Sequence, residues 1–131
     1  MIKQKEDLWR GDYKYFSVSE MACKCGCGGL PRHSFMLLME ELRQQAGFPM
    51  SVSSGFRCPE YNAALGGGPT HPLGLASDIR ISGSQAAILV GLAYQIGFMG
   101  VGVKQHGPRK GRFIHLDSWD SDQRPMIWSY Q

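Results

Sequence analysis

Two short segments, "ASDIRI" (76–81) and "RFIHLD" (112–117), alternate apolar and polar side chains. A period of two is typical of β-strands that pack one face against a core and leave the other face free. Isoleucine and leucine occupy one face of these segments, and the opposite faces carry three groups that can bind a metal ion or a proton: Asp78, His115 and Asp117. We therefore expect a sheet that presents these groups on the side away from its core.

Two longer segments have apolar residues at the spacing of an amphipathic helix. The first covers residues 34–46, with Ser34 placed to cap its start and Gly47 to end it. The second covers residues 84–97 and ends at Gly97. Shorter elements are expected at four places: a helical turn with a capping box at Ser17 and Glu20, strands at 50–54 and 100–104, and a helical turn or two at 60–65.

Helices followed by mostly hairpin-linked strands indicate an α+β domain. We expect a small antiparallel sheet with helices on one face and a cleft on the other. A chain of 131 residues is long enough to bury one core, so residues 1–131 are interpreted as a single domain. The cysteine-containing segment 1–30 is expected to pack on it.

The charge pattern excludes some partners. Fourteen Lys and Arg against 11 Asp and Glu give a formal net charge of +3, with no basic run longer than "PRKGR", which argues against a nucleic-acid-binding surface.

The first residues lack the apolar stretch of a signal peptide, and no segment approaches the ~20 apolar residues of a membrane span. We expect a monomer that is cytoplasmic on synthesis and does not bind membranes.

Four cysteines occur as "CKCGC" (Cys23, Cys25 and Cys27) and as the distant Cys58. In a chain without an export signal, such clustering favours metal binding or free thiols over disulfides. The usual spacing in structural zinc sites is C-x-x-C, however, and C-x-C-x-C departs from it. A structural zinc site made of all four cysteines, disulfides, and buried free thiols remain as alternatives.

The loop "GGPTHPLGL" places His71 shortly before the strand that carries Asp78. Together with His115, these residues provide two imidazoles and one carboxylate, which is a set of three protein ligands found in catalytic zinc sites with an open fourth position. The alternative is that each is an ordinary polar residue on a solvent-facing strand or loop. His33 and His106 are interpreted as surface residues.

Residues 53–78, "SSGFRCPEYNAALGGGPTHPLGLASD", resemble the signature S-G-[FY]-R-x-P-x-x-N…H-x-x-G-x-A-x-D of the D-alanyl-D-alanine carboxypeptidase-type zinc peptidases. These peptidases are related to lysostaphin and to the hedgehog metal site. The resemblance continues through "GVGVK", "FIHLD" and "RPMIWSY", and the opening "FSVSEMACKCGCGG" is similar to small phage and prophage members. The resemblance implies the fold of that group.

The resemblance implies that His71, Asp78 and His115 bind one catalytic Zn²⁺. Arg57 matches an arginine whose implied role is to hold a substrate carboxylate or carbonyl and to stabilise developing negative charge. Its alternative role is that of a surface arginine in an ion pair.

A general base is harder to assign. Family members usually carry an acid or a histidine two or three residues before the last ligand, where this chain has Phe113 and Arg112. We assign the base to Asp117, on the same strand face as His115, with the alternative that Asp117 orients the His115 imidazole. Trp119 is the candidate for substrate contact; it and Trp128 either flank the cleft or pack.

The implied function is a zinc-dependent peptidase that hydrolyses bonds involving D-amino acids in peptidoglycan stem peptides or crosslinks. The phage-like opening suggests an endolysin that acts on the cell wall after release, or a virion-associated lysin. The missing upstream base keeps an alternative open: an inactive zinc-containing module that binds cell wall or builds the virion. A weaker hypothesis makes "CKCGC" a zinc-knuckle for protein interaction on a scaffold.

Overall fold

A five-stranded sheet forms the centre of the structure, a computed structural model that describes residues 6–131. Its strands lie in the order β1-β2-β4-β3-β5. Their bounds are Ser51–Ser54 (β1), Ala76–Arg80 (β2), Gly100–Lys104 (β3), Phe113–Asp117 (β4) and Met126–Ser129 (β5). The expected strands at 50–54, 76–81, 100–104 and 112–117 are confirmed to within one residue at each end.

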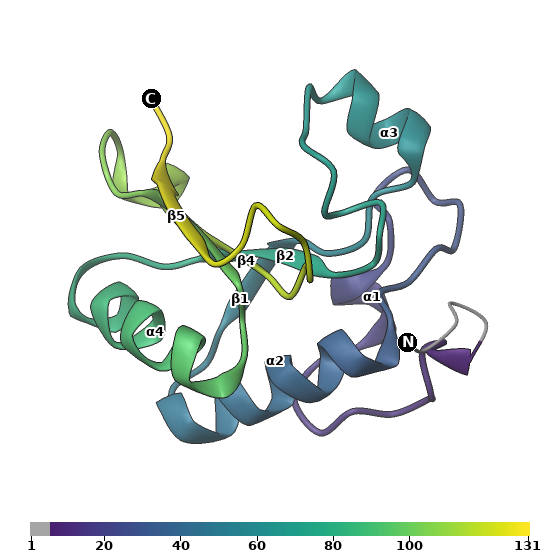
Figure 1. Cartoon of the computed structure of the whole chain (residues 1–131), viewed down its shortest axis with the longest axis horizontal. Helices are drawn as coiled ribbons and strands as arrows, with labels where there is room; N and C mark the ends of the chain where they lie inside the picture. Colours follow the sequence, from purple (N-terminus) through teal and green to yellow (C-terminus); the bar gives the residue numbers. More distant parts are fainter. Residues whose placement is uncertain (1–5) are drawn as a thin grey trace.

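The helices divide between the two sides of this sheet. They are α1 (Val18–Met21), α2 (His33–Ala46), α3 (Pro59–Ala64) and α4 (Gly83–Ile96), with a 3₁₀ turn at Arg109–Gly111. Figure 1 shows α2 and α4 together on one side of the sheet, and α3 on the opposite side. The α+β class and both predicted long helices are therefore confirmed.

The sheet is mixed, although we expected an antiparallel one. The β1–β2, β2–β4 and β3–β4 pairs are antiparallel, whereas β5 runs parallel to β3, with Met126 opposite Gly100. The physical reason is the route of residues 118–125. They leave the end of β4 and carry the chain past β3, so that β5 starts at the same end of the sheet as β3.

The core lies between the sheet and the helices α2 and α4. Ile79, Ile114 and Leu116 are buried on this face, as their alternation predicts, and they pack with Phe35 and Met39 of α2. The same alternation turns Asp78 and His115 to the opposite face. Burial of the apolar face of each strand therefore turns its polar side chains toward the opposite face of the sheet.

The N-terminal segment packs against the domain through Asp7, which caps α2. The helix begins at His33 without a cap from its own N-cap side chain, whereas we expected Ser34 to cap it. Instead, the Asp7 carboxylate accepts hydrogen bonds from Ser34 N at 2.7 Å and from Ser34 Oγ at 2.5 Å. A distant residue thus satisfies a free N–H of the first turn. Of the segment 1–30 that we expected to pack on the domain, residues 1–5 lie outside the described residues.

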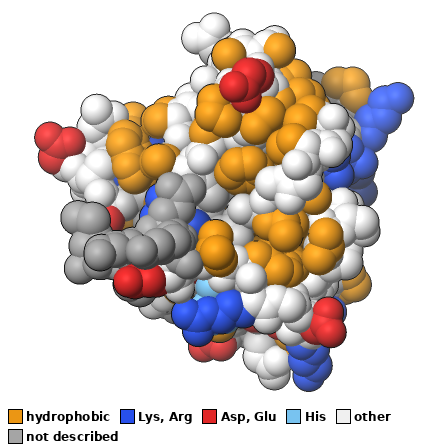
Figure 2. Space-filling view, turned by 90° about the vertical axis from the view of Figure 1, so that its right-hand side faces the viewer, with side chains coloured by type: hydrophobic (Ala, Val, Ile, Leu, Met, Phe, Trp, Pro, Cys, Tyr) orange, Lys and Arg blue, Asp and Glu red, His pale blue; other side chains and the backbone are white. Residues whose placement is uncertain are grey.

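Basic side chains do not form a continuous surface on the face shown in Figure 2. There, Lys and Arg lie in separate groups, with hydrophobic patches between them. Within residues 6–131, no helix combines the length and the apolar character needed to cross a membrane.

We expect Asp7→Ala to lower the free energy of unfolding by about 1–2 kcal/mol, because the first turn of α2 loses its cap. Urea denaturation followed by circular dichroism measures this change. Asp12→Ala, which removes an exposed carboxylate from the same segment, is the matched control. Equal unfolding midpoints for the two variants would show that Asp7 does not stabilise α2.

Candidate metal centre

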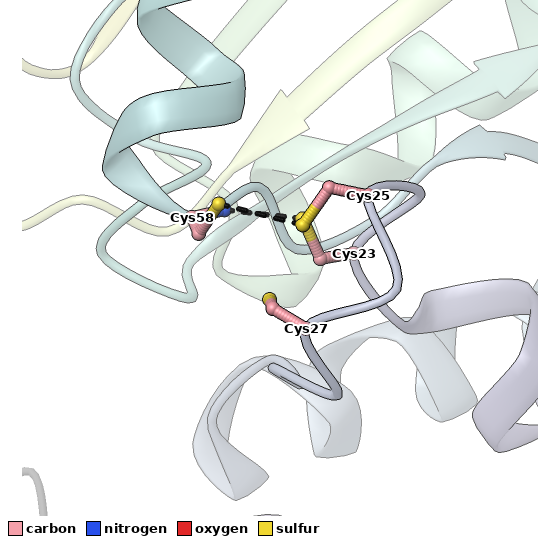
Figure 3. Close-up of side chains that lie close together, drawn as sticks. All are labelled: Cys23, Cys25, Cys27 and Cys58. Carbon is pink, nitrogen blue, oxygen red and sulfur yellow. Dashed lines mark hydrogen bonds between the residues drawn. The ribbon is translucent and has the colours of Figure 1, made fainter.

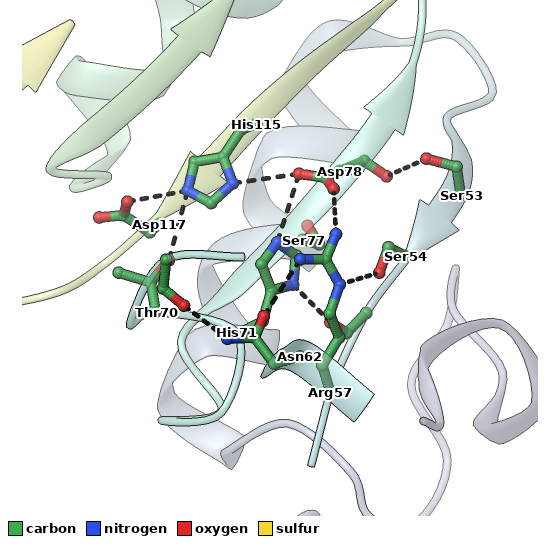
Figure 4. A network of polar contacts seen from close by, with 12 residues as sticks. Ser53, Ser54, Arg57, Asn62, Thr70, His71, Ser77, Asp78, His115 and Asp117 are labelled. Atoms are coloured by element: carbon green, nitrogen blue, oxygen red, sulfur yellow. Dashed lines mark hydrogen bonds and ion pairs between the residues drawn. The ribbon is translucent and has the colours of Figure 1, made fainter. Parts of the chain in front are cut away.

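His71, Asp78 and His115 converge on one point at the sheet face that is turned away from the core. All three are buried, and a ligand atom of each lies within 4.8 Å of the other two. Asp78 Oδ1 lies 3.0 Å from His115 Nδ1 and 3.4 Å from His71 Nε2. Figure 4 shows both imidazoles next to the Asp78 carboxylate, each joined to it by a dashed line. The three residues predicted to bind metal are thus brought together.

Strand register and one tight turn produce this convergence. Asp78 of β2 is the direct partner of His115 of β4, so their side chains leave the sheet next to each other. The loop before β2 folds back through a turn in which Gly74 N donates to the His71 carbonyl. Gly74 has a φ of 76°, which favours glycine, and a Cβ there would lie 3.1 Å from Arg32.

Hydrogen bonds behind each imidazole determine which nitrogen faces the site. His71 Nδ1 lies 2.7 Å from the Gly55 carbonyl, which can only accept, so Nδ1 carries the proton and Nε2 is free to bind a metal. His115 Nε2 lies 2.9 Å from Asp117 Oδ2, which leaves His115 Nδ1 facing Asp78. Such outer partners are usual for histidines that bind metals.

The charges of the site suit metal binding. Burial acts to raise the pKa of Asp78, but hydrogen bonds from His115 and His71 outweigh it and hold that pKa well below its usual range. Burial likewise opposes ionisation of Asp117, and hydrogen bonds from His115 and Arg124 outweigh it and lower its pKa. For His115, burial acts to lower the pKa, yet hydrogen bonds to Asp117 and Asp78 raise it. The ligand Asp78 is therefore ionised at neutral pH, as metal binding requires, whereas a metal at His115 would have to displace the proton that its raised pKa favours.

Asp117 lies behind the site rather than in it. Its side chain is fully buried, and Arg124 donates to both of its oxygens, from Nε at 3.0 Å and from Nη2 at 2.9 Å. The Arg124 guanidinium carbon lies 4.9 Å from the ring centroid of Trp119 and 5.1 Å from that of Trp128. Asp117 therefore contacts the ligand imidazole and has no open path to the cleft.

The metal site opens into a cleft of about 400 Å³. Its walls include Thr70, Phe113, Arg124, Trp128, Tyr130 and the glycine-rich loop at 66–68. Trp119, our candidate for substrate contact, does not line this cleft. It lines a separate hollow of about 630 Å³ with Asp7 and Leu73.

Arg57 lines the same cleft and is paired with the metal site. Its Nη2 donates to Asp78 Oδ2 at 2.9 Å, and its Nε and Nη1 donate to Ser54 and Asn62 at 2.9 Å and 3.2 Å. Asn62 in turn donates to the Gly68 carbonyl and so ties down the glycine-rich loop. A guanidinium has five N–H donors, and these three bonds leave two for a ligand. The ion pair and substrate binding are therefore compatible.

Sequence reasoning missed Arg124 and gave Trp128 no firm role. The terminal "RPMIWSY" belonged to the resemblance, but an arginine in a loop carries no period that marks it. The only hints in the sequence were Gly100 and Gly102 of β3, whose missing side chains leave space for neighbouring groups. A Cβ at Gly100 would overlap Asp117, and one at Gly102 would lie 2.6 Å from Trp128 Nε1. Neither His33 nor His106 lines the cleft.

Residues 14–117 match the family model described as Peptidase M15. The chain belongs to the M15 peptidase family. The match contains all three candidate ligands and ends at Asp117. A comparison with curated proteins found no significant match.

M15 peptidases are zinc-dependent metallopeptidases that act on peptidoglycan-type peptides. The residues of this chain fit a zinc ion, because two imidazoles with fixed outer partners and one ionised carboxylate face a common point beside an open cleft. The match spans all three residues, and their geometry makes them a possible metal site.

We expect Asp117→Asn to weaken zinc binding by about 10–100-fold, because the amide no longer holds the His115 imidazole as the carboxylate does. Competition with a chromophoric chelator measures the affinity, and Asp122→Asn, at an exposed position, is the control. Unchanged zinc affinity together with a lost catalytic rate would instead support Asp117 as the base.

Proposed function

We propose that this M15 peptidase hydrolyses peptide bonds that involve D-amino acids in peptidoglycan stem peptides or crosslinks. The observation that carries the proposal is the buried His71, Asp78 and His115 set, which faces an open cleft in a chain of this family. The resemblance of residues 53–78 to the D-alanyl-D-alanine carboxypeptidase signature supports the substrate class.

The metal would be held by His71 Nε2, His115 Nδ1 and Asp78 Oδ1, the atoms that face one another in the structure. Bound zinc supplies a water of lowered pKa and polarises the scissile carbonyl. Gly55 and Asp117 keep the two imidazoles in the orientation that presents these nitrogens. The ligand set is therefore preorganised before substrate binds.

Arg57 is proposed to bind the substrate. Its two remaining N–H donors can reach an oxygen of a peptide carboxylate or carbonyl in the cleft, and its charge stabilises a developing oxyanion. Tyr130 lines the same cleft. Burial raises the pKa of Tyr130, so its hydroxyl stays protonated at neutral pH and serves as a second donor.

Asp117 is proposed to be a positioning residue rather than the general base. It is enclosed by His115, Arg124 and the backbone N–H of Trp119, and it does not line the cleft. Within residues 6–131, Asp78 is the only carboxylate in the cleft wall.

The second candidate function is a module that binds zinc and cell wall without hydrolysis. Among residues 6–131, no carboxylate other than the ligand Asp78 lines the cleft, and this favours the binding module. For either function, the phage-like opening "FSVSEMACKCGCGG" suggests an endolysin or a virion-associated protein as the setting.

The two functions are separated by incubating the zinc-loaded protein with purified peptidoglycan and analysing released fragments by mass spectrometry. We expect new peptide termini next to a D-amino acid, which disappear with chelator and with His71→Ala. His33→Gln, away from the cleft at the start of α2, is the control and should retain activity. Zinc-bound protein that pulls down with peptidoglycan and releases nothing would reject the peptidase and favour the binding module.

The fragments also identify the bond. Released free D-alanine indicates a carboxypeptidase, whereas conversion of crosslinked dimers to monomers indicates an endopeptidase.

A further inference from the structure

Four cysteines form a second cluster of metal-binding side chains. Cys23, Cys25 and Cys27 lie in the loop that follows α1, and Cys58 directly precedes α3. One sulfur atom from each lies within 4.8 Å of the other three. Figure 3 shows the four side chains turned toward a common centre, although the chain separates Cys58 from the others by about thirty residues. None of them lines the active-site cleft.

The distances between the sulfur atoms fit one central ion. Cys25 Sγ lies 3.3 Å from Cys23 Sγ and 3.6 Å from Cys58 Sγ. A disulfide requires about 2.05 Å, and all four cysteines are free thiols in the structure. Four sulfurs about 2.3 Å from one tetrahedral ion lie about 3.8 Å from each other. An iron–sulfur cluster, with several metals and sulfides between the thiolates, would hold the sulfurs farther apart.

The backbone of the loop is shaped for this arrangement. Gly26 and Gly28 have φ values of 87° and 84°, and the loop is closed by hydrogen bonds from Cys23 N to the Gly29 carbonyl and from Gly26 N to the Cys23 carbonyl. These turns let the irregular C-x-C-x-C spacing direct three sulfurs to one point. Cys58 N donates to Cys23 Sγ at 3.3 Å, a bond that stabilises a thiolate.

We propose that Cys23, Cys25, Cys27 and Cys58 bind a second zinc ion in a closed, structural four-thiolate site. Four thiolates in a tetrahedral set select zinc or iron among biological metals, and they leave no open position for substrate. Cys25 and Cys27 are exposed, which gives the ion a path of entry. This proposal goes beyond the peptidase function and does not depend on it.

The site would join the N-terminal segment to the loop that supports the catalytic centre. That loop, residues 55–58, contains the Gly55 carbonyl that fixes His71 and the Arg57 side chain that pairs with Asp78. Apart from the sulfurs, it is held to the N-terminal segment by Phe56 N, which donates to the Met21 carbonyl at 2.9 Å. A zinc ion bound to Cys58 would add a strong crosslink one residue from Arg57.

Metal analysis combined with X-ray absorption at the zinc edge tests the proposal on the full chain, purified under reducing conditions with zinc. We expect two zinc ions per wild-type chain. His71→Ala should retain one zinc with a shell of sulfur at about 2.3 Å, and Cys58→Ser should retain one zinc with nitrogen and oxygen ligands only. The two variants serve as reciprocal controls.

Should Cys58→Ser fail to fold, the exposed Cys25→Ser replaces it, and the His71→Ala spectrum remains decisive by itself. The proposal is overturned if folded His71→Ala holds no zinc, if its zinc has no sulfur neighbours, if iron occupies the cysteines, or if mass spectrometry shows disulfides. One zinc with only nitrogen and oxygen ligands in the wild type would reject this site and leave the peptidase proposal standing. One zinc with only sulfur ligands in the wild type would support the cysteine site and reject the metal site of the peptidase proposal.

Discussion

The proposed active site depends on the pairing of β2 with β4. Their register sets Asp78 directly opposite His115, and the Asp78 carboxylate reaches both imidazoles. A shift of one residue would turn Asp78 into the core and Ile79 into the cleft, because side chains alternate along a strand. Packing of the isoleucines against α2 and α4 therefore also fixes the position of the metal ligands.

Two arginines make it possible to bury the carboxylates of this site. Arg57 pairs with Asp78 and Arg124 pairs with Asp117, so each charge has an opposite charge within 3 Å. An isolated buried carboxylate would be costly and would tend to take up a proton. Both arginines lie outside the regular strands and helices, so loops supply the charges that the sheet residues require.

The cysteine cluster also concerns a loop that supports groups of the sheet. The sheet positions Asp78 and His115, whereas His71 and Arg57 depend on the loop at 55–58 and on what holds it. That loop is packed against the end of α1 and the segment after it, where the Met21 backbone leaves no room for a side chain at Gly55 and the Phe56 ring leaves none at Gly29. A structural metal at Cys58 would give this short connection the rigidity that a catalytic site needs.

The sequence by itself determined the features that depend on local periodicity: α2, α4, the polar face of β2 and β4, and the three ligand candidates, with their family resemblance. Only the tertiary structure decided four others. They are the parallel placement of β5, the cap from Asp7, the enclosure of Asp117 by Arg124, and the exchange of Trp119 for Trp128 in the cleft. Each of these depends on contacts between segments far apart in the chain or on the path of a loop. Such contacts and loop paths produce no periodic pattern of apolar residues, so sequence reasoning could not find them.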